Sequence, residues 1–97
     1  MYNRRVSFEW DNVKNAENIA KHGISFDEAQ EAFFDVKHVT WLDKKHSHEE
    51  QREYCAGNTG KGIATVRFTM RGDTIRIFGA GYWRGGRKVY EARNQIY

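Results

Sequence analysis

Two segments of alternating apolar and polar residues flank Gly72-Asp73, and this arrangement restricts the fold more than any other feature of the sequence. The segments cover residues 63–71 and 74–79, and a two-residue Gly-Asp connection favours a tight β-hairpin. Arg71 then pairs with Thr74, which places apolar residues of both strands on the same side. The expected pairs on this core side are Met70 with Ile75, Phe68 with Ile77 and Val66 with Gly79.

The opposite side of this hairpin is predicted to be polar and strongly basic. It carries Arg67, Thr69, Arg71, Thr74 and Arg76. Arg67 and Arg76 lie diagonally across the pair, and close like charges weaken a sheet unless an anion lies between them. We therefore expect a phosphate or a carboxylate at this place. The alternatives are a solvent-exposed arginine surface, or pairing within the chain to Glu49, Glu50 or Glu53.

The same alternation continues into the glycine-containing segment that follows the hairpin. It places Phe78, Ala80 and Tyr82 on the arginine side and turns Trp83 toward the core. The small residues 79–81 leave open space beside these side chains. Because aromatic rings stack with bases and guanidinium groups bind phosphates, this surface suits a nucleotide.

The N-terminal segment predicts a short strand followed by a helix. The apolar residues of the strand alternate with polar ones, and they are Val6, Phe8 and Trp10. Asp11 is placed to cap a helix that starts at Asn12, and Gly23 is placed to end it in the left-handed conformation. Apolar or small residues recur at helical spacing in this helix: Val13, Ala16, Ile19 and Ala20.

A second helix is predicted directly after the first. Ser25 and Glu28 form an S-x-x-E capping box, which favours a helix over residues 26–34. Its predicted inward residues are Phe26, Ala29, Phe33 and Phe34. The link between the two helices is so short that they must pack as a hairpin or an elbow.

Strands over residues 36–42 and 52–57 and a closing helix over 86–95 complete the predicted elements. Their order is β-α-α-β-β-β-β-α. This order indicates an α+β fold with the helices on one face of an antiparallel sheet, where the two N-terminal helices pack and a C-terminal helix closes the chain. Because 97 residues can build one small core, we expect a single domain over residues 1–97.

Positive charge gathers in the last third of the chain, although the net charge is only +3. Residues 61–93 carry eight Lys or Arg against Asp73 and Glu91, so this part is expected to bind anions. No apolar run is long enough to span a bilayer or to form a secretion signal, and we expect a cytoplasmic protein with no membrane partner.

The sequence offers no recognisable cofactor or metal motif. Cys55 is the single cysteine, so it cannot form an internal disulfide, and we expect it to be a small buried apolar residue. The segment "HSHEE" at 46–50 contains imidazoles and carboxylates, but its spacing matches no standard zinc motif.

Two segments of the sequence resemble the BrnT family, which comprises toxins of bacterial type II toxin–antitoxin pairs. They are "FEWDNVKNAENIAKHGISFDEA" at 8–29 and "VRFTMRGDTIRIFGA" at 66–80. In the first, the residues at the spacing of the family are Phe8, Trp10, Asp11, Lys14, Asn18, Lys21, His22, Gly23, Ser25, Phe26, Glu28 and Ala29. In the second they are Thr69, Arg71, Gly72, Asp73, Ile75, Arg76 and Ile77. The resemblance extends from Phe8 to about Glu91.

This resemblance implies a fold like that of RelE-type ribonucleases and an activity that cleaves RNA and inhibits growth. It also implies silencing by a BrnA-like antitoxin, whose ribbon-helix-helix part binds operator DNA. Since such domains form as intertwined dimers, we expect a complex of two toxins with two antitoxins. Many members of the family continue the last strand into Ser-Ala-Arg, whereas Gly81 stands at the place of that arginine here. The positive charge of that arginine is therefore either lacking in this chain or supplied by Arg84.

RNA cleavage by internal transfer needs a base for the 2′-hydroxyl, charge stabilisation at the phosphate and an acid for the leaving oxygen. The predicted catalytic residues are His22, Lys21, Arg67, Arg76 and Tyr82. The predicted RNA-binding residues are Arg71, Arg84, Arg87 and Lys88, and no metal is required.

The same residues, and the chain as a whole, also fit other interpretations. Lys21 and His22 also suit simple stabilisation of a helix C-terminus, which is worth about 0.3–1 kcal/mol. Tyr82 suits either base stacking or proton transfer. For the whole chain, the alternatives to a ribonuclease are a non-catalytic module that binds the antitoxin and acts as co-repressor, and a nucleic-acid-binding domain without cleavage activity.

Overall fold

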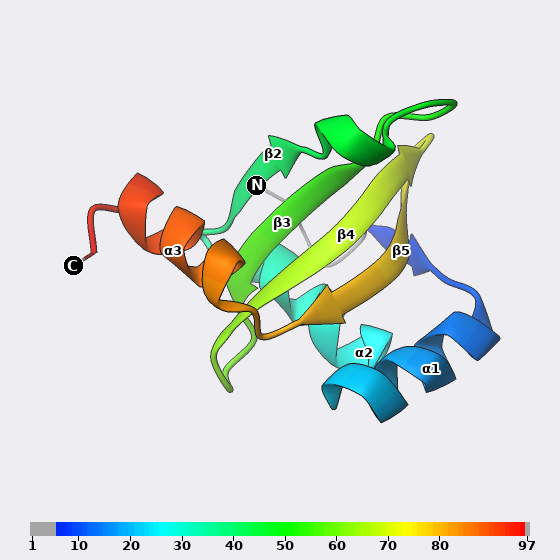
Figure 1. Cartoon of the computed structure of the whole chain (residues 1–97), viewed down its shortest axis with the longest axis horizontal. Helices are drawn as coiled ribbons and strands as arrows, with labels where there is room; N and C mark the ends of the chain where they lie inside the picture. Colours follow the sequence, from blue (N-terminus) through cyan, green and yellow to red (C-terminus); the bar gives the residue numbers. More distant parts are fainter. Residues whose placement is uncertain (1–5, 97) are drawn as a thin grey trace.

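The computed structural model describes residues 6–96 of the chain (Figure 1). One five-stranded sheet is flanked by helices. The elements are β1 (Ser7–Glu9), α1 (Asn12–His22), α2 (Phe26–Ala29), the 3-10 helix η1 (Gln30–Phe34), β2 (Val39–Leu42), the 3-10 turn η2 (Lys44–His46), β3 (Glu53–Asn58), β4 (Ile63–Arg71), β5 (Thr74–Gly81) and α3 (Arg84–Arg93). None of the helices in this part of the chain has the length and apolar character needed to cross a membrane.

The sheet is mixed, which corrects the antiparallel sheet predicted from the sequence. Its strand order is β1-β5-β4-β3-β2, and β1 pairs parallel to β5, with Phe8 opposite Ile75. The other three pairs of strands are antiparallel. In the sequence, all the other strands lie between β1 and β5. No tight turn therefore joins these two strands, and they are free to pair in parallel.

The predicted starts of the two N-terminal helices are confirmed. The Asp11 carboxylate accepts hydrogen bonds from the backbone N–H groups of Val13 and Lys14, and Gly23 ends α1 at φ 69°. Ser25 Oγ accepts a hydrogen bond from the Glu28 N–H and so caps α2. The α-helical part then ends at Ala29, because the chain continues as the tighter η1 instead of the regular helix predicted to residue 34.

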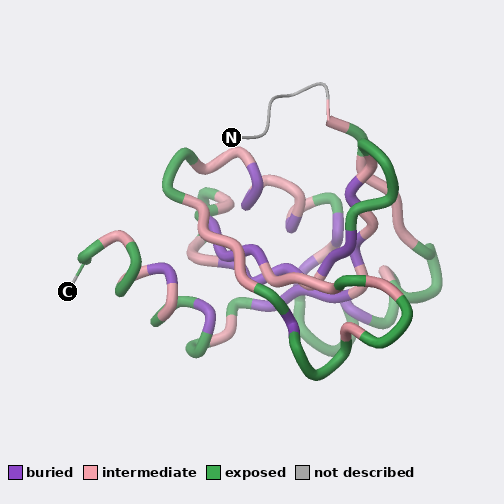
Figure 2. The backbone as a smooth tube through the Cα atoms, turned by 90° about the horizontal axis from the view of Figure 1, so that it is seen from above, coloured by how far each residue is buried: buried purple, intermediate pink, exposed green. Residues whose placement is uncertain are grey.

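The hydrophobic core lies between one face of the sheet and the segment formed by α2 and η1. The Phe33 ring packs edge to face against Phe68 of β4 and Phe8 of β1, with ring centroids 5.0 and 5.5 Å apart. Three distant segments therefore meet at this ring. Cys55 is fully buried in this core, as predicted. Figure 2 shows the buried positions gathered in the middle of the molecule, with exposed positions along the outer loops and helix ends.

The apolar residues of α1 point away from the core, which is the reverse of the usual amphipathic arrangement. Val13 and Ile19 are 68 % and 46 % exposed, whereas Asn18 is buried. Asn18 lies against the edge of β5 that β1 leaves open. Its amide donates to the Ala80 carbonyl and accepts from the Ala80 N–H, at 2.9 and 3.2 Å. Polar groups therefore attach α1 to the sheet, since an open strand edge needs hydrogen bonds.

The last helix packs on the opposite face of the sheet from α2, so the prediction that the helices share one face is wrong for α3. Thr65 alternates with the core residues of β4, and its side chain lies directly under Gly86 of α3. A Cβ at Gly86 would come within 1.7 Å of Thr65 Oγ1. Arg93 near the end of α3 donates to the Thr40 carbonyl of β2.

A β-bulge changes the predicted register of the hairpin halfway along. Phe68 pairs with Ile77 as predicted, but Arg67 pairs with Gly79, so Phe78 is an extra residue on β5. Beyond the bulge each side chain changes face. Ala80 therefore lies in the core opposite Val66, and the predicted pairing of Val66 with Gly79 is wrong.

Candidate functional site

A basic hollow of about 250 Å³ lies between α1 and the polar face of the sheet. Its lining combines cationic side chains with one aromatic ring. The main lining residues are Lys14, Lys21, His22, Arg52, Arg67 and Phe78, and Glu17 and Asn18 also contribute. The structure thus brings together three of the predicted catalytic residues, namely Lys21, His22 and Arg67.

Local structure explains why these side chains meet. Asn18 holds α1 against β5, and Lys21 and His22 stand in the last turn before Gly23 ends the helix. The bulge keeps Phe78 on the same face as Arg67, which agrees with the prediction for Phe78. A hydrogen-bonded asparagine and a strand irregularity therefore set the position of the hollow.

Arg67 is the cation of the hollow whose side chain contains a buried, unsatisfied nitrogen. Its guanidinium lies over Gly79, where a Cβ would approach Nη2 to 2.7 Å. Its Nε is buried without a hydrogen-bond partner, and no carboxylate pairs with it among residues 6–96. An unsatisfied buried donor costs roughly 1–3 kcal/mol, and such groups call for a functional or structural explanation.

Two cations that the sequence analysis did not assign to the site lie over the Phe78 ring. The Arg52 guanidinium carbon is 4.2 Å from the ring centroid, and Lys14 Nζ is 5.7 Å from it. Lys14 precedes Lys21 by seven residues. This is about two helical turns, so the spacing could have placed both on the same side of the helix. Arg52 comes from the loop before β3, and nothing in the local sequence pointed to it.

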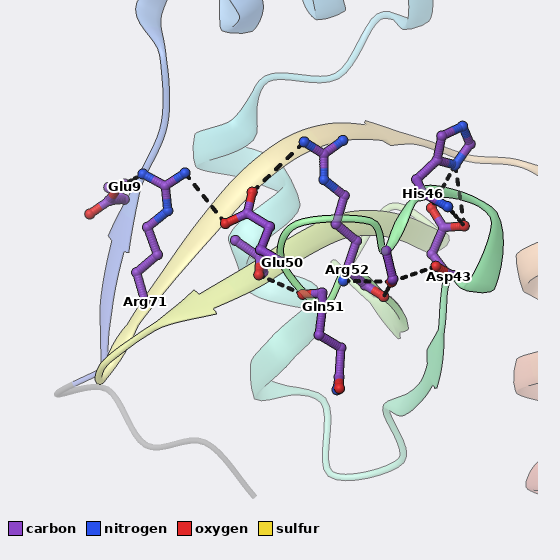
Figure 3. Close-up of polar contacts among 9 residues, drawn as sticks. Glu9, Asp43, His46, Glu50, Gln51, Arg52 and Arg71 are labelled. Atoms are coloured by element: carbon purple, nitrogen blue, oxygen red, sulfur yellow. Dashed lines mark hydrogen bonds and ion pairs between the residues drawn. The ribbon is translucent and has the colours of Figure 1, made fainter.

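Arg71 and Arg76 lie apart from the hollow in a network of carboxylates, which Figure 3 shows in part. Arg76 Nη1 donates to Glu9 Oε2 at 2.8 Å, and Arg71 Nη1 is 4.0 Å from the same oxygen. Glu50 lies between Arg71 and Arg52, at 3.6 and 3.8 Å. Carboxylates of the chain therefore pair with these arginines; the alternative that named Glu50 is confirmed, whereas Glu9 was missed.

Tyr82 does not reach the hollow. The change of face at the bulge turns it toward α2, where its hydroxyl donates to Glu28 Oε2 at 2.5 Å and lies 2.6 Å from Thr59 Oγ1. Burial and the bond to Glu28 raise the pKa of Tyr82. A hydroxyl held in this way is poorly suited to proton transfer, which leaves stacking as its predicted role.

Trp83 takes the place near the hollow that was predicted for Tyr82, so the prediction that Trp83 turns into the core is wrong. It is half-buried, and its ring meets the His22 ring edge to face at 5.2 Å. A Cβ at Gly81 would come within 2.4 Å of this ring. The Trp83 ring thus occupies the space that a side chain at position 81 would need.

The remaining predicted RNA-binding residues line a second groove, next to α3. Arg84, Arg87 and Lys88 line this groove together with Tyr82 and Trp83, and its volume is about 600 Å³. The structure therefore separates the predicted site into three parts: the hollow, the groove, and the paired arginines of β4 and β5.

One histidine of segment 46–50, His46, takes part in local structure. His46 Nδ1 lies 2.9 Å from Oδ2 of the buried Asp43, which also accepts the His46 N–H. Within residues 6–96, no three side chains of His, Cys, Asp or Glu gather in a way that would hold a metal ion.

Comparison with known proteins adds the family. The model of the ribonuclease toxin BrnT of type II toxin–antitoxin systems matches residues 10–85 of this 97-residue chain. The chain belongs to the BrnT family. Membership makes it a ribonuclease toxin, with RNA as substrate and an antitoxin protein as partner. The match includes every lining residue of the hollow but stops before Arg87 and Lys88. A search of curated proteins found no match.

Proposed function

We propose that this BrnT toxin cleaves RNA in the hollow between α1 and the sheet, by internal transfer and without a metal ion. The observation that carries the proposal is Arg67, a cation at the hollow with no carboxylate partner among residues 6–96 and a buried, unsatisfied Nε. A phosphate is the ligand that such a guanidinium binds best, because its oxygens match the fork of N–H donors.

Each step of the reaction has a candidate in the hollow. The 2′-oxygen attacks phosphorus while the bond from phosphorus to the 5′-oxygen breaks, which leaves a 2′,3′-cyclic phosphate and a free 5′-hydroxyl. His22 takes the proton of the 2′-hydroxyl, since imidazole exchanges protons readily near neutral pH. Lys21, its neighbour in the last turn of α1, donates a proton to the leaving oxygen. Arg67 stabilises the charge that develops on the phosphate.

Arg52, Lys14 and Phe78 prepare the place of the substrate in this proposal. The two cations hold the rim positive, and the Phe78 ring beneath them supports them in this position. Arg71 and Arg76 act as further phosphate contacts only when an incoming phosphate competes with Glu9 and Glu50. We therefore rank them below Arg67.

We propose a BrnA-like antitoxin with a ribbon-helix-helix part that contacts operator DNA. The expected complex contains two toxins and two antitoxins. The exposed apolar side of α1, defined by Val13, Ala16, Ile19 and Ala20, supports a protein partner because nothing in the described chain covers it. A RelE-like fold and action in the cytoplasm belong to the same proposal. Light scattering of the co-purified complex tests the stoichiometry, and a stable 1:1 mass would contradict it.

The cleavage proposal is tested with purified toxin and single-stranded RNA in excess chelator. We expect cleavage without divalent metal, and products that end in a 2′,3′-cyclic phosphate and a 5′-hydroxyl. Cleavage that appears only after magnesium is added would contradict the metal-free mechanism. Failure to cleave under either condition, with antitoxin binding intact, would favour the non-catalytic co-repressor module.

A further inference from the structure

The groove beside α3 is a second basic surface that the proposed chemistry does not use. Its lining includes Lys61, Arg84, Arg87 and Lys88 and the rings of Tyr82 and Trp83. It encloses about 600 Å³, which is more than twice the 250 Å³ of the hollow.

The charges of the groove are only partly neutralised. Lys61 pairs with Glu28 at 3.2 Å and Arg87 with Glu91 at 3.3 Å. Arg84 and Lys88 have no carboxylate partner within residues 6–96, and the first turn of α3 contains no acidic residue. Cations that line one groove repel one another, and a bound polyanion lowers the free energy of this repulsion.

The aromatic wall of the groove is held in place. The Tyr82 hydroxyl is fixed because it donates a hydrogen bond to Glu28 and shares another with Thr59, while 39 % of this residue remains exposed. Trp83 packs against Gly81 on one side and meets His22 on another. Rings that are fixed in this way lose little entropy when a base stacks on them.

The groove and the hollow share a wall. His22 lines the hollow, Trp83 lines the groove, and their ring centroids are 5.2 Å apart. A strand bound at Arg67 would therefore continue past these two rings into the groove.

We propose that the groove binds the single-stranded RNA that flanks the cleaved phosphate, with its backbone on Arg84, Arg87 and Lys88 and a base on Tyr82 or Trp83. This inference rests on the proposed function of the hollow. Cations interleaved with aromatic rings are typical of single-strand binding and favour RNA over an acidic protein segment. The groove makes the toxin select substrates that are longer than the two nucleotides joined at the cleaved bond.

The test compares a twelve-nucleotide RNA with a dinucleoside monophosphate as substrates. The groove variant is Arg87→Ala with Lys88→Ala, and the matched control is Lys44→Ala with Lys45→Ala, which removes two exposed charges outside both cavities. For the groove variant we expect kcat/KM on the long RNA to fall roughly tenfold more than on the dinucleotide, mainly through KM. Binding of an uncleavable 2′-O-methyl twelve-mer should also lose about 1.4 from the slope of log K against log salt.

The outcomes separate this inference from the proposal on which it rests. If the groove variant loses kcat/KM equally on both substrates, or not at all on the long RNA, the inference is overturned. Cleavage by the unmodified toxin would still support the proposed function. A groove variant that keeps its preference for long RNA but loses affinity for the antitoxin would overturn it as well, and would assign the groove to the protein partner. If the unmodified toxin cleaves neither RNA, the proposed function fails. In that case the salt slope for the twelve-mer still tests the groove, because an equal slope for the groove variant and the unmodified toxin would overturn RNA binding there.

Discussion

Arg76 of β5 donates a hydrogen bond of 2.8 Å to Glu9 of β1, across the parallel pair of strands. The same carboxylate lies 4.0 Å from Arg71, so one acidic side chain balances two of the arginines on the polar face. Arg67 on the same face has no such partner within the described residues. This difference separates the arginine that we assign to the phosphate from those that the protein already pairs.

Removing the charge of Glu9 should strengthen RNA binding. In Glu9→Gln, Arg71 and Arg76 lose the carboxylate that they share, and we expect affinity for an uncleavable RNA to rise roughly two- to fivefold at low salt. Fluorescence anisotropy measures this affinity. Glu49→Gln, which removes one charge outside the network, is the control; an equal gain for both variants would mean that only net charge matters.

The attachment of α1 to β5 should depend on one buried amide. Asn18→Ala leaves the Ala80 N–H without its partner at a buried site, and we expect the free energy of unfolding to fall by about 2–3 kcal/mol. Urea unfolding measures the loss. The exposed Asn12 in the same helix offers a control, because Asn12→Ala should change stability by no more than about 0.5 kcal/mol. Similar losses for both variants would show that the amide does not anchor α1.

Asp35 should make stability depend on pH in the acid range. Burial alone would raise its pKa, but hydrogen bonds from the Tyr90 hydroxyl and from the N–H groups of Asn58 and Lys37 outweigh burial, so the pKa of Asp35 lies below its usual value. A lowered pKa stabilises the folded state above the unfolded pKa of about 3.9, and this contribution disappears as pH falls through the lower folded value.

The variant Asp35→Asn tests this pH dependence. We expect it to cost about 1–3 kcal/mol at pH 7 and clearly less near pH 2–3, as measured by urea unfolding of both proteins. Asp73→Asn in the exposed turn of the hairpin serves as control and should show no such trend. A deficit for Asp35→Asn that is the same at both pH values would contradict the assignment.

The exposed side of α1 should be a contact of the antitoxin. Val13→Asp with Ile19→Asp places two charges on this side, and we expect antitoxin affinity to fall at least roughly tenfold, since charges at the centre of an interface are poorly tolerated. Calorimetric titration measures the affinity. Val36→Asp alters another apolar residue, which is 74 % exposed on a different segment, and should bind normally. Normal affinity of the α1 variant would place the antitoxin elsewhere.

Much of the fold was predictable because it depends on local rules. The caps at Asp11, Gly23 and Ser25 and the start of the hairpin at Gly72-Asp73 are set by residues within a few positions, and all of these predictions are confirmed. The direction of β1 and the outward apolar side of α1 depend on contacts with β5, more than 60 residues away, and no periodicity in the sequence reports them.

The candidate site was predictable up to the bulge. Strict alternation correctly places Phe78 beside Arg67, but one extra residue opposite the Arg67–Phe68 step exchanges the faces of the residues that follow. Tyr82 and Trp83 therefore lie on the sides opposite to those predicted. The sequence contains no signal for the bulge, and Glu9 and Arg52 reach their partners only through tertiary structure.

Single-turnover cleavage by Arg67→Ala shows whether the hollow at Arg67 is where RNA is cleaved. Removing a group that stabilises transition-state charge costs roughly 10²–10³ in rate. We therefore expect at least about a hundredfold loss for Arg67→Ala, with unchanged circular dichroism and antitoxin binding. Arg93→Ala, which removes a guanidinium that contacts Thr40 outside the hollow, should retain its rate. A folded Arg67→Ala toxin that cleaves RNA as fast as the unmodified protein would show that the hollow is not the site of cleavage.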